Sequence, residues 1–228
     1  MTQRDSDVLS RFVFERTNVR GELVHLDATW RAILERRDYP EPVRELLGQA
    51  MAAAALLITT IKFSGSLILQ IQGDGPVSLI VVQAKSDRTL RGLAHWADPV
   101  LPGPLAQQVG DARLAITIDQ GGDRERYQGI VALNTEETLA HALEEYFKRS
   151  EQLATRLWLA AGDERAAKLL FELFFLRTFR LALGLLGDEA DAEEVAAGRV
   201  PEGRQGAERS VGQRVLLSVA RATQRARL

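Results

Sequence analysis

The sequence predicts an α+β domain in which mixed, largely antiparallel sheets pack against helices. Two observations carry this prediction: residues 46–61 form an uncharged apolar run, and two β-like runs, 67–72 and 77–83, follow it directly. A membrane-spanning helix needs about 18 or more apolar residues, and the first run is shorter and contains Gln49. We therefore interpret it as a core helix, rich in alanine, that lies on a sheet.

The two β-like runs have the signature of a hairpin. Alternation in 67–72 places Leu67, Leu69 and Ile71 on one face and Ile68 with two glutamines on the other, as in a half-covered antiparallel sheet. The turn Gly73-Asp74-Gly75-Pro76 joins the runs, and its glycines are expected to supply positive φ angles. Helix and hairpin together are the predicted nucleus of the domain.

The N-terminal part predicts three short elements. Residues 7–15 are a short amphipathic segment, and residues 17–26 alternate like a strand broken by a turn or bulge at Gly21. Asp27 is expected to cap a helix that contains Trp30.

Further elements follow the hairpin in chain order. We expect strands at 89–96, 112–119, 126–133 and 155–160, a loop or short helix at 98–108, and a helix that begins at 135. The second and third of these strands form a hairpin, because Gln120-Gly121-Gly122-Asp123 is a strong turn signal.

Composition limits the function classes. The net charge is −2, so no strong field favours nucleic acid or an anionic membrane as partner. The sequence has no cysteine, which excludes disulfides, thiolate metal sites and a cysteine nucleophile in this chain. The N-terminus lacks the apolar region of a signal peptide, so we expect a cytoplasmic protein.

Catalytic and metal motifs are missing from the sequence. His25, His95 and His141 do not have ligand spacing, no GxSxG nucleophile motif occurs, and the Gly73 turn lacks the Gly-Lys-Ser/Thr of a phosphate loop. We expect no enzyme, no metal and no cofactor. A Ser-His-Asp relay stays open, as does a small-molecule-binding enzyme, a hydrolase or a transferase, with a site around the Gly73 turn or His95.

The chain changes character after Gly162. We divide it into a core domain, 1–163, an apolar helical segment, 164–187, and a charged, flexible tail, 188–228. Five acids lie in 188–194, and seven arginines against two glutamates in 199–228. Residues 215–228 could form a basic amphipathic helix on a partner.

The apolar helical segment is the candidate binding surface. Its apolar content is hard to bury on one helical stripe, and exposed apolar patches mark contact sites. The candidate residues are Leu169, Leu170, Phe171, Leu173, Phe174, Phe175 and Phe179. Two alternatives remain: the segment docks back on the core, or the basic tail, 199–228, binds an acidic partner in an assembly.

Several strings of residues in 8–163 are more specific than any single motif. They include Arg20-Gly21-Glu22, Gly73-Asp74-Gly75-Pro76, Tyr127-Gln128-Gly129, and the run Tyr146-Phe147-Lys148-Arg149-Ser150-Glu151-Gln152. In this order they resemble the core of the thirty-three-kilodalton, redox-regulated heat-shock chaperone family.

The resemblance implies an ATP-independent holdase of the bacterial cytosol that binds unfolding client proteins during heat and oxidative stress. In that family a mixed α and β core precedes a helical linker and a domain whose four cysteines bind zinc when reduced. Oxidation releases the zinc, unfolds the linker and exposes client-binding surface, and the active forms are dimers. Under this resemblance the partners are unfolded clients and a second copy of the chain.

The sequence departs from the family after Asp163. A Phe/Leu-rich helix replaces the expected Gly-rich return strand, and no cysteine follows, so neither zinc binding nor redox control carries over to any residue here. We favour a truncated or out-of-frame tail over an evolved new linker.

Overall fold

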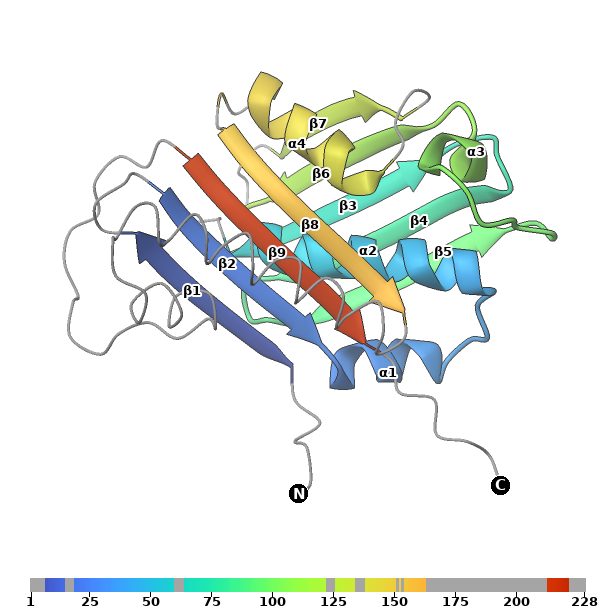
Figure 1. The fold of residues 1–228 in the computed structure, drawn as a ribbon, viewed down its shortest axis with the longest axis horizontal. Helices are drawn as coiled ribbons and strands as arrows, with labels where there is room; N and C mark the ends of the chain where they lie inside the picture. Colours follow the sequence, from blue (N-terminus) through green and yellow to red (C-terminus); the bar gives the residue numbers. More distant parts are fainter. Residues whose placement is uncertain are drawn as a thin grey trace, which may run out of the picture.

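The computed structural model places two β-sheets on either side of a central helix (Figure 1). It describes residues 7–14, 19–59, 64–121, 126–133, 138–150, 152, 154–162 and 213–221. The four-stranded sheet has the order β1-β2-β9-β8, and the five-stranded sheet has the order β5-β4-β3-β6-β7. The predicted α+β class is confirmed.

In the described residues the strands follow one another in groups of two or three, separated by helices. In chain order they are β1 Val8–Phe14, β2 Val19–Leu26, α1 Ala28–Leu34, α2 Glu41–Ile58, β3 Ser66–Gln72, β4 Val77–Lys85, β5 Leu90–Trp96, α3 Leu105–Val109, β6 Arg113–Asp119, β7 Tyr127–Ala132, α4 Leu139–Ser150, β8 Ala154–Gly162 and β9 Gln213–Arg221.

Helix α2 is the predicted core helix, and it is buried on all sides from Ala50 to Leu57. It contacts strands of both sheets, so it has no solvent face along this stretch. A helix that is apolar all round is stable only when surrounded by protein. The alanines in its middle leave room for both sheets to approach the helix backbone.

The hairpin that follows α2 is confirmed, with β3 and β4 paired antiparallel. The role predicted for its turn glycines is wrong, because neither Gly73 nor Gly75 has a positive φ. Both are needed for space: a Cβ atom at either position would overlap the end of α3 around Val109. The Gly75 N–H donates to the Val109 carbonyl at 2.9 Å, and the Asp74 carboxylate accepts the Asp111 N–H at 2.7 Å.

Strand β2 runs without a break, so the interruption predicted at Gly21 is wrong. The register with β1 continues on both sides of this glycine, from Val19 to His25. The amphipathic segment at the N-terminus is strand β1, the antiparallel partner of β2.

Helix α1 forms where predicted, but its N-terminal cap comes from elsewhere. Asp27 makes no side-chain cap and pairs instead with Arg31 at 3.2 Å. The carboxylate of Asp7 accepts the backbone N–H groups of Asp27 and Thr29 and the Thr29 hydroxyl. A residue twenty positions away, just before β1, therefore fixes the start of this helix.

The later elements agree with the sequence prediction. Strands β6 and β7 form the expected hairpin, β5 and β8 the other expected strands, and α3 is the short helix in the proline-rich segment. The described part of the next helix, α4, begins at Leu139 and buries the residues that its periodicity selects, among them Leu143 and Tyr146.

Helix α4 is fastened to β8 by one carboxylate. Glu144 accepts the backbone N–H of Leu157 at 2.7 Å and a guanidinium N–H of Arg156 at 3.0 Å. Strand β8 is at the edge of its sheet, so the backbone N–H groups on its outer side have no strand partner. The carboxylate therefore satisfies a donor that the fold would otherwise leave unpaired.

We expect Glu144→Ala to lower the free energy of unfolding by about 1–3 kcal/mol, because it leaves the Leu157 N–H without its acceptor. Urea unfolding followed by circular dichroism measures the change. Arg156→Ala is the control: its side chain is 74% exposed, so its ion pair with Glu144 contributes less than about 1 kcal/mol. Equal losses in both variants would contradict this role for the backbone hydrogen bond.

Within the predicted tail, residues 213–221 form strand β9, so the helix predicted from 215 onward is wrong. Strand β9 lies between β2 and β8 and is parallel to both. Its run Val215-Leu216-Leu217-Ser218-Val219-Ala220 is uncharged and rich in β-branched and apolar residues, as buried parallel strands are. The boundaries at 163 and 187 stay predictions, and all seven candidate binding residues of 164–187 lie outside the described residues.

Candidate functional site: the open face of the five-stranded sheet

The five-stranded sheet has one face against α2 and one face that no described helix covers. Strand alternation decides which side chains go where: Leu69, Ile80 and Ile116 are buried against α2, and their neighbours along each strand point the other way. We call the second side the open face.

An apolar row crosses the open face through all five strands. Cross-strand pairing sets Leu93 opposite Val81, Val81 opposite Gln70, Gln70 opposite Ala115, and Ala115 opposite Ile130. Leu93 is 42% exposed and Ile130 is 60% exposed, although both are large apolar side chains. One glutamine is the only polar side chain in a row otherwise formed by aliphatic groups.

Polar and cationic side chains flank this row. The neighbouring row on one side contains His95, Gln72 and Arg113 together with Leu79 and Ala132. The row on the other side contains Arg91, Gln83, Thr117 and Gln128 together with Ile68. The acid Asp119 lies toward one end of the face, where it pairs with Arg126 at 3.0 Å. An apolar centre with an uncharged and cationic rim suits an extended apolar segment of another protein.

The strings of residues that carry the family resemblance have structural roles elsewhere. Gly129 is on the core side of β7, where a Cβ atom would overlap the ring of Tyr146 in α4. The Tyr146 hydroxyl is 3.4 Å from that of Tyr127, and its ring packs edge-on against Phe147 at 5.6 Å. These motif residues dock α4 on β7, and of this group only Gln128 points to the open face, where it bonds Thr117.

The remaining residues of the run that begins at Tyr146 lie at the C-terminal end of α4 and just after it. Arg149 pairs with Glu145 at 3.0 Å, and the hydrogen bond from Lys148, with both cations nearby, lowers the pKa of the Glu145 carboxyl. Ser150 is the last helical residue, and Gln152 has a φ of 53° as the chain turns into β8. Glu151 lies outside the described residues.

The N-terminal motif joins the four-stranded sheet to α2. Glu22 is 8% exposed, pairs with Arg11 at 3.5 Å and accepts a hydrogen bond from the Thr59 hydroxyl at the end of α2. Of Arg20 the structure describes only the backbone, which pairs with Val13. The sequence motifs therefore mark how the core is assembled, and the structure does not bring them together into one site.

The described residues do not assemble a metal centre. In the described ranges no group of three or more His, Asp or Glu side chains could hold a metal ion. His95 is exposed on β5, and the turn that begins at Gly73 is closed against α3. Among the helices of the described part, none is long and apolar enough to cross a membrane.

Sequence reasoning missed Leu93 and Ile130 as candidate site residues. The signal was present: in residues 89–96 and 126–133 both lie on the strand face opposite to the core-facing residues. What the sequence lacks is any sign of whether a second layer covers that face.

Comparison with known proteins places the chain in a family. The sequence model of the Hsp33 protein family matches residues 7–176. The 33 kDa chaperonin of Nitrosococcus oceani is 53% identical over 172 residues, 75% of this chain and 58% of that protein. The 33 kDa chaperonin of Aeromonas salmonicida is 47% identical over 176 residues, again 58% of its length. This chain thus spans little more than half the length of these relatives.

A solved structure shares the fold. The crystal structure of the 33 kDa chaperonin (heat shock protein 33 homolog) of Thermotoga maritima superposes with a TM-score of 0.51 at 20% identity, covering 75% of this chain and 67% of that one. With the family match over three quarters of the sequence, the resemblance noted from its motifs is confirmed. The chain belongs to the Hsp33 protein family.

Proposed function

We propose that this chain is an ATP-independent holdase that captures unfolding proteins on the open face. The observation that carries the proposal is the exposed apolar row from Leu93 to Ile130, on a chain related to proteins named chaperonins. Burying apolar surface releases about 25 cal/mol per Å², which drives capture without nucleotide. Its partners are unfolded or misfolding proteins in the cytoplasm, and it works as a homodimer without binding nucleic acid or membrane.

The absence of cysteine gives the proposal its second part. Family resemblance implies a zinc-bound thiol switch, and zinc thiolate sites need deprotonated cysteine sulfur. This sequence has none, so capture here is independent of redox state and of zinc. The apolar segment 164–187, with Leu169 and Phe174 among its candidate client-binding residues, adds to the binding surface.

The test is light scattering from a thermally unfolding enzyme that is mixed with the purified protein. We expect equal suppression of aggregation in dithiothreitol and in hydrogen peroxide, with and without a zinc chelator. No suppression under any condition would reject the holdase. Suppression that differs several-fold between the reducing and oxidising arms would reject the switch-free mechanism and keep the holdase.

A further inference from the structure

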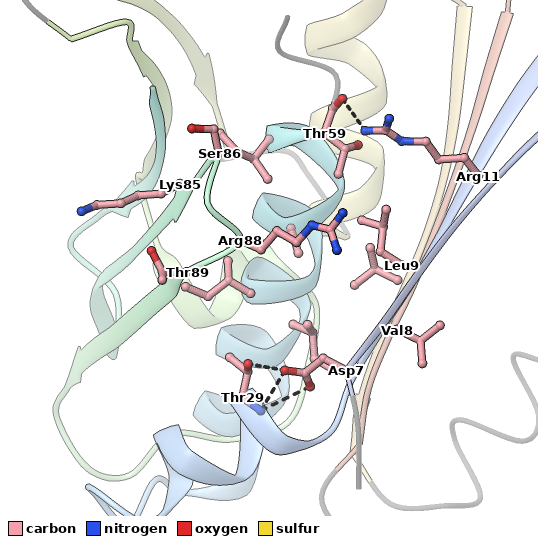
Figure 2. Close-up of a pocket in the computed structure, with 15 residues that line it drawn as sticks. Asp7, Val8, Leu9, Arg11, Thr29, Thr59, Lys85, Ser86, Arg88 and Thr89 are labelled. Atoms are coloured by element: carbon pink, nitrogen blue, oxygen red, sulfur yellow. Dashed lines mark hydrogen bonds between the residues drawn. The ribbon is translucent and has the colours of Figure 1, made fainter. Parts of the chain in front are cut away.

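A cavity of about 500 Å³ lies between strands β1 and β2 of the four-stranded sheet and the β4–β5 turn of the five-stranded sheet (Figure 2). Its walls come from β1 and β2, from the last turn of α2 and from the β4–β5 turn. Its lining is mixed: polar and charged residues of β1, α1 and the β4–β5 turn share it with the apolar residues Val8, Leu9, Val24, Leu26, Ala55, Ile58 and Leu90. A cavity of this size, with both apolar and polar side chains, can hold a small amphiphilic ligand.

Three charged groups close to the cavity are already engaged. The Asp7 carboxylate accepts hydrogen bonds from the start of α1, and Arg11 pairs with Glu22 and donates to the Thr59 carbonyl at 2.9 Å. The carboxylate of Asp87 accepts the hydroxyl and N–H of Thr89, at 2.6 and 2.9 Å, and these bonds lower its pKa. None of these groups is left for a ligand.

Arg88 is different. Figure 2 shows its guanidinium group directed into the cavity, on the side of Leu9 and Thr59, while the ammonium group of Lys85 points away. The Arg88 side chain makes no hydrogen bond or ion pair with another residue in the described ranges. A guanidinium keeps its charge at any physiological pH and binds a carboxylate through two parallel hydrogen bonds.

The backbone at Arg88 is also unusual. Its φ is 68°, a left-handed conformation that glycine or asparagine normally occupies. The tight turn requires this angle, since the Arg88 N–H donates to the Lys85 carbonyl and the Lys85 N–H to the Thr89 carbonyl, both at 2.9 Å. A long side chain is thus held at a position where glycine would be less strained, which is typical of functional sites.

We propose that this cavity binds a single-chain amphiphile with an anionic head group, such as a medium-chain carboxylate. The alkyl chain lies against the apolar side chains that β1, β2 and α2 contribute to the lining, and the head group pairs with Arg88. This site is separate from the open face and does not depend on the capture of unfolded proteins.

The test is isothermal titration calorimetry with dodecanoate below its critical micelle concentration. We expect saturable binding of one dodecanoate per chain. Arg88→Gly should weaken it roughly tenfold or more, because a charge-assisted hydrogen bond is lost. The same variant should unfold at an equal or higher temperature, because glycine adopts this φ without strain. A residue with a purely structural role would not combine these two changes.

Lys85→Ala is the matched control, since it removes one positive charge from the same turn but points away from the cavity. Its affinity should equal that of the unaltered chain, as should that of the open-face variant Leu93→Asp/Ile130→Asp. The proposal is overturned if the unaltered chain shows no saturable binding, if Arg88→Gly binds as tightly, or if Lys85→Ala weakens binding equally. Binding of dodecyltrimethylammonium with the same affinity, or binding only to phosphatidylglycerol vesicles, would also overturn it.

Discussion

Replacing both Leu93 and Ile130 with aspartate is expected to raise at least tenfold the amount of this chain needed to suppress aggregation of an unfolding enzyme. Each side chain that a client no longer buries forfeits about 1.5–3 kcal/mol of hydrophobic free energy. Each new carboxylate would also have to lose its water in the complex. The measurement is light scattering against the ratio of chaperone to client.

The unfolding temperature of the double variant should stay unchanged, because these side chains are 42% and 60% exposed and face away from α2. Leu101→Asp is the matched control. Leu101 is 71% exposed, more than either, but it is in the loop before α3 and not on the open face. Unaltered activity in the double variant, or an equal loss in Leu101→Asp, would show that the open face is not the capture site.

The sequence was sufficient for the local elements of this fold. Uncharged length identified α2 as a core helix, and period-two alternation identified the hairpins β3–β4 and β6–β7. These signals depend on residues that are neighbours along one element. For the same reason the helical periodicity of the sequence predicted which residues of α4 are buried, among them Leu143.

Errors arose where a distant segment decides the outcome. The cap of α1 is Asp7 from the start of β1, and Gly73 is needed because α3 comes close, which no local pattern records. Strand β9 was taken for a helix because its partners, β2 and β8, are far away in sequence. The open face was missed on the same grounds, since alternation shows that Ile130 faces away from the core but not whether anything covers it.

Gly129→Val should be among the most damaging single substitutions in the described core, with a loss of about 2–3 kcal/mol of unfolding free energy. Any Cβ atom at this position overlaps the Tyr146 ring, which is 3% exposed. The added volume must push α4 away from β7. Urea unfolding measures the loss, and we expect it as a lower midpoint with a similar slope.

Two further variants separate this clash from a general effect of valine in the strand. Ala132→Val adds a similar volume to the same strand, but on its exposed side, and should change stability by less than about 0.5 kcal/mol. Tyr146→Ala alone costs stability by leaving a cavity, but in combination with Gly129→Val it removes the group that clashes. The double variant should therefore lose less than the sum of the single losses. Additive losses would mean that position 129 does not act through Tyr146, and that the helix α4 is held on β7 by other contacts.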